Sequence, residues 1–162
     1  MTPADSHSVA PDKIVQAVEA ELETLTQVLD MLDIEHEALM GNDAERLEQA
    51  VAAKQNAISA HLQSRSEREA LGLRDSLAEQ VETHPSLVNG LRERALSAVS
   101  ELSRLATESK LLNTRNGKLI AGLRERTSAS IKVLRPEAAS ISLYGGSGSA
   151  ENTMGSRLLG SA

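Results

Sequence analysis

Apolar residues recur at steps of three and four along residues 12–41, which is the spacing of one face of an α-helix. Most acidic residues of this segment fall outside that stripe. Pro11 opens the pattern and Gly41 and Asn42 close it, because glycine suits the left-handed position after a helix. The sequence therefore predicts an amphipathic helix here. The stripe consists of Ile14, Val18, Leu22, Leu25, Val28, Leu29, Leu32 and Leu39.

A second helical pattern follows almost at once. Asn42 and Glu45 resemble a capping box, and Asp43 suits the first turn of a helix. This helix should end near Gly72, which offers another left-handed cap. Because the connection is so short, we expect the two helices to run antiparallel. The predicted inner face of the second helix carries Leu47, Val51, Lys54, Ile58 and Leu62.

The rest of the pattern contains a short helix and a very long one. Residues 74–83 form the short helix, with Leu77 and Val81 facing inward, and His84 should be extended because Pro85 follows it. Ser86 should then cap a stripe of roughly fifty residues, or ~70 Å of helix. Such a length indicates either a coiled-coil-like rod or an interruption near Asn116 and Gly117. The stripe consists of Leu87, Val88, Leu91, Ala95, Val99, Leu102, Leu105, Leu112, Leu119, Ile120, Leu123, Ile131 and Leu134.

Composition supports an all-α fold. The chain has one tyrosine and no phenylalanine or tryptophan, whereas sheets draw heavily on aromatic residues. We expect an antiparallel helical bundle or hairpin with a long C-terminal helix and a disordered C-terminal tail. In this division, residues 1–11 are a flexible tail, residues 12–135 the helical domain, and residues 136–162 a flexible Ser/Gly-rich tail.

Signals for catalysis, metals and cofactors are missing, so we expect a protein that is not an enzyme. No cysteine is present, which excludes disulfides and thiol chemistry. The four histidines form no metal-binding motif, although His36 and His61 could meet across the first two helices. The glycine run at 145–148 lacks the Lys-Ser/Thr of a phosphate loop. The chain start resembles no secretory signal, and no stretch has the ~20 apolar residues of a membrane helix.

Charge is unevenly distributed along the chain. Residues 1–64 hold twelve acids and three bases, whereas residues 65–162 hold eleven acids and fourteen bases. The basic segment 104–135 could simply balance the acidic first helix, or it could bind an acidic or helical protein. Nucleic acid is disfavoured, because the protein is acidic overall and lacks stacking residues.

Tyr144 is the only aromatic residue and lies beyond the last predicted helix. An aromatic ring in a polar tail can anchor a partner's pocket, or it can pack back onto its own bundle. The residues alone leave both interpretations open.

Several elements together resemble the FlgN family. The first helix is rich in Leu and Glu, and a short acidic break follows at residues 41–43. Leu47 and Lys54 come next, and then an Arg-rich stretch ends in Leu-Gly at residue 72. An Asn-x-x-Asn-Gly-x-Leu-Ile element spans residues 113–120, and Tyr144-Gly145 follows. The resemblance covers roughly residues 12–148.

This resemblance implies a cytoplasmic chaperone of flagellar type III export. Such a chaperone binds the hook–filament junction proteins FlgK and FlgL through its C-terminal amphipathic helix and delivers them to the export gate FlhA. Tyr144 would contact the gate, and Met154, Leu158 and Leu159 have no assigned role. The client-binding residues would be Leu112, Asn116, Leu119, Ile120, Leu123, Ile131 and Leu134.

The expected state is a monomer or weak homodimer without membrane insertion. A coiled-coil scaffold that pairs the same stripe with itself is the alternative. A helical-bundle metalloenzyme is the enzymatic rival, but the sequence lacks the carboxylate–His pairs that such a site needs.

Overall fold

The computed structural model describes residues 10–134, which form four helices and no strand. The prediction of an all-α fold is confirmed. α1, α2, α3 and α4 up to Arg124 belong to one compact unit, and the last turns of α4 belong to a second unit. Residues 1–9 and 135–162 lie outside the described residues, and with them the whole predicted C-terminal tail (136–162) and most of the predicted N-terminal tail (1–11), whose last residue, Pro11, begins α1. In chain order the helices are α1 (Pro11–Gly41), α2 (Ala44–Ala70), α3 (Leu77–Thr83) and α4 (Asn89–Leu134).

The turn between α1 and α2 reverses the chain within two residues. Asn42, not Gly41, takes the left-handed conformation, with φ 50° and ψ 37°. Asp43, not Asn42, caps α2, and its carboxylate accepts a hydrogen bond of 3.0 Å from the Arg46 N–H. Both predicted positions were therefore wrong by one residue, because asparagine tolerates the left-handed region and aspartate is an equally good cap. The two helices run antiparallel, as the short connection predicted.

The inner face of α2 differs from the predicted one. Leu47, Val51 and Lys54 are half-buried, but Ile58 and Leu62 are 39% and 57% exposed. The predicted stripe contains several steps of four residues, and four residues exceed one helical turn, so the stripe drifts toward solvent. The α2 residues that face α1 are instead Ala50, Lys54, Ala57, His61, Ser64 and Arg68.

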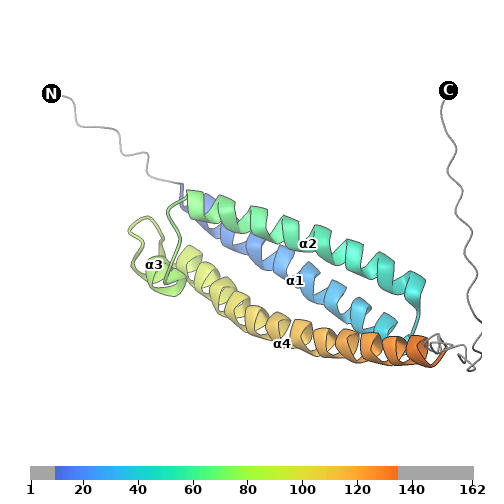
Figure 1. The fold of residues 1–162 in the computed structure, drawn as a ribbon. Coiled ribbons are helices and arrows are strands. Elements are labelled where there is room, and N and C mark those ends of the chain that lie inside the picture. Colours follow the sequence, from blue (N-terminus) through green and yellow to red (C-terminus); the bar gives the residue numbers. More distant parts are fainter. Residues whose placement is uncertain (1–9, 135–162) are drawn as a thin grey trace, which may run out of the picture. The chain divides into compact units, whose positions relative to one another are not determined.

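α1 lies between α2 and α4, and α3 lies beside the start of α1 (Figure 1). α4 runs parallel to α1, since Glu19 pairs with Arg94 and Asp33 pairs with Arg115. The contacts near the C-terminal end of α1 join residues that are 80–84 positions apart in the sequence, whereas Glu19 and Arg94 are 75 apart. At this offset Gly41, the last residue of α1, is level with the part of α4 around Leu123.

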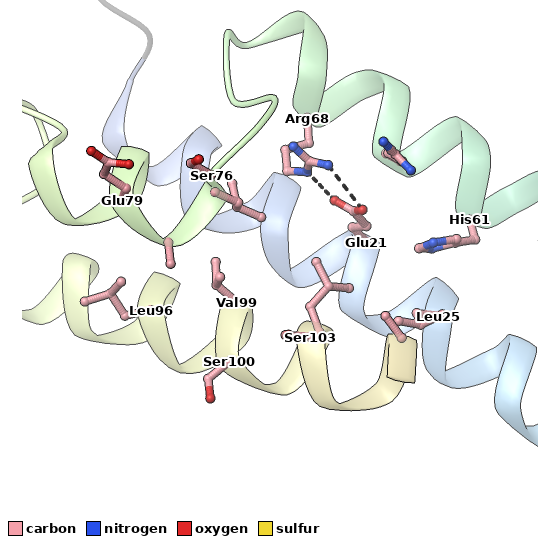
Figure 2. A pocket seen from close by; sticks show the side chains of 15 residues that line it. Glu21, Leu25, His61, Arg68, Ser76, Glu79, Leu96, Val99, Ser100 and Ser103 are labelled. Carbon is pink, nitrogen blue, oxygen red and sulfur yellow. Dashed lines mark hydrogen bonds and ion pairs between the residues drawn. The ribbon is translucent and has the colours of Figure 1, made fainter. Parts of the chain in front are cut away.

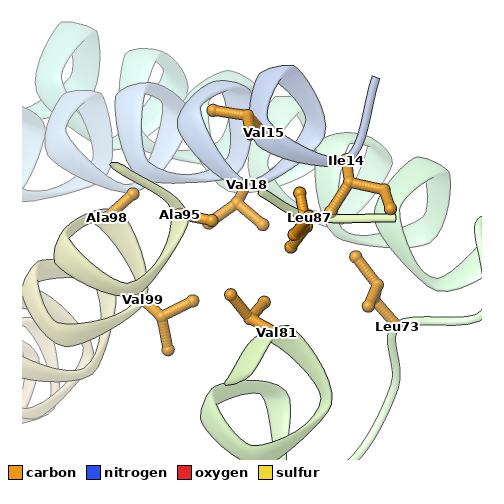
Figure 3. Close-up of a cluster of buried hydrophobic side chains, with 9 residues drawn as sticks. All are labelled: Ile14, Val15, Val18, Leu73, Val81, Leu87, Ala95, Ala98 and Val99. Carbon is orange, nitrogen blue, oxygen red and sulfur yellow. The ribbon is translucent and has the colours of Figure 1, made fainter. Parts of the chain in front are cut away.

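The core has two clusters along α1. The first lies beside α3, whose Val81 is fully buried in it (Figure 3). Leu77 packs against the same cluster, so both residues face inward as predicted. The second cluster joins the middle of α1 to α4. The first cluster consists of Ile14, Val15, Val18, Leu73, Val81, Leu87, Ala95, Ala98 and Val99, and the second of Leu25, Val28, Leu29, Leu32, Leu102 and Leu105.

The start of α4 lies three residues after the predicted cap at Ser86. Leu87 is only 1% exposed, because a turn at Pro85 and Ser86 places it in the first cluster before the helix begins at Asn89. The Arg92 guanidinium fixes this connection by donating hydrogen bonds to the carbonyls of Leu87 (2.7 Å) and His84 (3.1 Å). α4 then continues for 46 residues without a break at Gly117. The long rod, not the interruption, is therefore the correct alternative.

Replacing Leu32 by alanine should lower the free energy of unfolding by about 2–5 kcal/mol, because this core side chain is 2% exposed. Helical circular dichroism followed through a urea titration measures the change. Met40→Ala is the matched control, since Met40 lies on the same helix and is 67% exposed, and it should cost less than about 0.5 kcal/mol. Equal losses in the two variants would contradict this assignment of the core.

Candidate functional site

The apolar stripe of α4 becomes steadily more exposed toward the C-terminal end of the helix. Leu102 and Leu105 are 9% and 6% exposed, because they pack against the middle of α1. The predicted client-binding residues Leu112, Leu119, Ile120 and Leu123 are half-buried. Ile131 and Leu134 are 50% and 80% exposed. The same face of one helix therefore changes from core to surface.

Asn116 is the one predicted client-binding residue that is fully buried, at 1% exposure. Its side-chain nitrogen donates hydrogen bonds to the Leu32 carbonyl (2.7 Å) and to Glu35 Oε2 (3.0 Å). Its oxygen lies 3.2 Å from His36 Nδ1. All polar atoms of the Asn116 side chain thus lie within hydrogen-bonding distance of α1. Asn116 can therefore contact a client only if α4 separates from α1 near this residue.

A buried ion pair extends this polar network to α2. Glu35 is 1% exposed and lies 2.5 Å from Lys54 Nζ. Asn116 therefore joins a hydrogen-bonded group that draws on α1, α2 and α4. Sequence reasoning missed the group, although the signal was present as polar residues at Glu35, Lys54 and Asn116 in otherwise apolar stripes.

The C-terminal half of α4 carries an excess of positive charge. Arg104 pairs with Glu101 and Glu108 on its own helix, and its hydrogen bond lowers the pKa of Glu101 below the ordinary value. Arg115 lies 3.5 Å from Asp33. Charge balance against α1 thus explains only part of the basic segment. Among the described residues, no ion pair is formed by Lys110, Lys118, Arg124, Arg126 or Lys132.

A pocket of about 790 Å³ opens beside α3, between α2 and α4 (Figure 2). Leu25 and the Glu21–Arg68 ion pair lie on its α1 and α2 sides, and Ser100 and Ser103 on its α4 side. Arg68 donates to Glu21 and to the Leu73 carbonyl, so its charge is satisfied internally. Sequence reasoning did not predict this pocket, because its lining comes from all four helices and carries no shared sequence motif.

The histidines occupy separate levels of the bundle. His61 Nδ1 lies 3.4 Å from Thr24 Oγ1, whereas His36 contacts Asn116, so the two rings do not meet. Within residues 10–134, no three acidic or histidine side chains come together as candidate metal ligands. None of the described helices has an apolar stretch long enough to cross a bilayer.

Several predicted functional residues lie outside the described part of the chain. Tyr144, the expected contact of the export gate, is one of them. Met154, Leu158 and Leu159, to which the sequence assigned no role, also lie outside the described residues.

Comparison with known proteins identifies the chain. No curated protein and no solved structure matches it. The sequence model of one family, described as FlgN protein, matches residues 10–152, which is most of the chain. That family consists of chaperones that bind flagellar hook-associated proteins, not of enzymes. This chain therefore belongs to the FlgN family of flagellar export chaperones.

Proposed function

We propose that this protein is a cytoplasmic chaperone that binds the terminal helical segment of FlgK and FlgL, keeps both proteins soluble and delivers them to the export gate FlhA. Membership of the FlgN family supports the class of client and the compartment. The observation that carries the proposal is the change of the α4 stripe from buried to exposed between Leu105 and Leu134.

The exposed stripe suits a helical client. α4 has 46 residues and α1 has 31, so α1 cannot cover α4 along its whole length. An amphipathic segment can lay its apolar face along such an uncovered stripe, and this removes both apolar surfaces from water. Ile131 and Leu134 are accessible without any rearrangement, so they would make the first contact.

The half-buried part of the stripe would extend this contact. Leu112, Leu119, Ile120 and Leu123 already expose part of their side chains. Asn116 lies among them and holds α4 on α1 through hydrogen bonds rather than through apolar packing. A client that loosened this segment would gain the remaining apolar surface but would leave polar atoms of Asn116 and Glu35 without partners. That cost keeps binding reversible, as delivery to a gate requires.

The unpaired bases on α4 favour a client segment with acidic residues beside its apolar face. Lys118, Arg124, Arg126 and Lys132 have no ion-pair partner among the described residues. Opposite charges across an interface mainly increase the association rate and select between partners.

Replacing both Ile131 and Leu134 by serine should weaken the binding of FlgK and FlgL at least about tenfold, because two apolar side chains no longer contribute buried surface. Isothermal titration with each purified client measures the dissociation constant. Val133→Ser is the matched control, since Val133 is 80% exposed but lies about 100° around the helix from Leu134. An unchanged affinity of the double variant would show that the client binds elsewhere.

Tyr144→Ala should leave client affinity unchanged and weaken docking of the loaded chaperone at FlhA, since a single aromatic anchor can carry much of a small interface. Binding of the chaperone–FlgK complex to the cytoplasmic part of FlhA, followed by surface plasmon resonance, tests this. Tyr144→Phe serves as the control that keeps the ring. Equal gate affinity of the natural and alanine forms would refute the role of Tyr144.

A further inference from the structure

Two buried ion pairs join α1 to α2 in one consistent register. Glu21 pairs with Arg68, and both side chains are 5% exposed (Figure 2). Glu35 pairs with Lys54 at 2.5 Å, with side chains 1% and 15% exposed. The step from residue 21 to 35 on α1 equals the step from 68 to 54 on α2, and it is two heptads long. The pairs therefore occupy equivalent positions of an antiparallel heptad packing.

The other residues in this interface follow the same heptad spacing. Leu25, Leu32 and Leu39 are buried on α1, and small residues occur on α2 at the matching interval. Ala50 is 3% exposed, and Ala57 packs against the second core cluster. Large residues on α1 thus face small residues on α2, which are Ala50, Ala57 and Ser64.

This apolar pattern cannot by itself select one register. If α2 slides by one heptad in either direction, two of the three leucines of α1 still face alanine or serine of α2. The apolar contacts of the shifted hairpins are therefore close to those of the native one. The turn at Asn42 and Asp43 limits such a slide within one chain, but it does not govern pairing between two chains.

The charged residues do distinguish the registers. A slide in one direction places Arg68 opposite Val28 and Glu35 opposite His61. A slide in the other direction places Arg68 opposite Ile14 and Lys54 opposite Val28. Each shifted pairing buries charges without an opposite charge, which costs far more than any apolar contact gains.

We propose that Glu21, Glu35, Lys54 and Arg68 are specificity residues that restrict the apolar stripe of α1 to α2 in a single register. They exclude heptad-shifted pairings of the two helices, both within one chain and between α1 of one chain and α2 of another. The inference concerns the α1–α2 hairpin alone and does not depend on the proposed client or its binding surface.

Cysteine cross-linking tests this directly, because the chain has no cysteine of its own. His61→Cys with Thr24→Cys reports the native register, since these side chains lie 3.4 Å apart. His61→Cys with Met31→Cys or with Ala17→Cys reports a slide of one heptad in either direction. Under mild oxidation of the full chain with its natural charges, we expect the native pair to form at least about tenfold more disulfide than either shifted pair.

The charges are then removed by Glu21→Leu, Glu35→Leu, Lys54→Met and Arg68→Met together. The shifted pairs should now rise to within about threefold of the native pair, or disulfide-linked dimers should appear on non-reducing gels. If the native intramolecular pair remains as dominant as before, the turn and apolar packing set the register and the proposal is overturned.

A charge-reversal series keeps the test decisive should the uncharged variant fail to fold. Glu21→Arg with Glu35→Lys places like charges across the interface and should abolish the native cross-link. Adding Arg68→Glu and Lys54→Glu restores opposite charges and should restore the native cross-link. If the fully reversed chain cross-links no better than the half-reversed chain, the pairs do not select the register.

Discussion

Burial of α1 between α2 and α4 is the constraint on which the rest of the structure depends (Figure 1). α1 supplies the largest share of buried side chains, and both core clusters include it. The contacts that α1 makes with α2 differ in kind from those it makes with α4. Toward α2 it pairs carboxylates with buried bases and leucines with small residues, whereas toward α4 it packs mostly apolar groups. The hairpin is therefore specified by charge, and α4 is held mainly by apolar surface.

This division has a consequence for α4. The buried apolar residues of α1 end at Leu39, whereas the stripe of α4 continues to Leu134. Near Asn116 the contact between α1 and α4 changes from apolar packing to hydrogen bonds, and the stripe residues Ile131 and Leu134 are exposed. We propose that α4, whose stripe is buried near its start and exposed near its end, serves as both scaffold and binding surface. The family assignment and the distribution of apolar surface thus favour the same role.

Much of this arrangement could be predicted from the sequence, because helical periodicity and the absence of most aromatic residues both exclude sheets. The number of helices, their approximate bounds and the inward face of α3 followed from that pattern. The face of α2 did not, because its inner positions are occupied by charged and small residues that a search for apolar stripes passes over. Asn116 was assigned to the client because it belongs to a motif, whereas its burial depends on Leu32 and Glu35, far away in the sequence. The pocket beside α3 is lined by residues of all four helices, and no residue type marks such a space in the sequence.

Hydrogen exchange tests whether the exposed part of the apolar stripe of α4 holds the client. Amide protection would be compared by mass spectrometry between the chaperone alone and the chaperone saturated with FlgK. We expect residues 119–134 to gain protection on binding, while α1 and α2 change little, because exchange reports local opening of each segment. Protection that appears in α2 or around the pocket beside α3, with residues 119–134 unchanged, would contradict it.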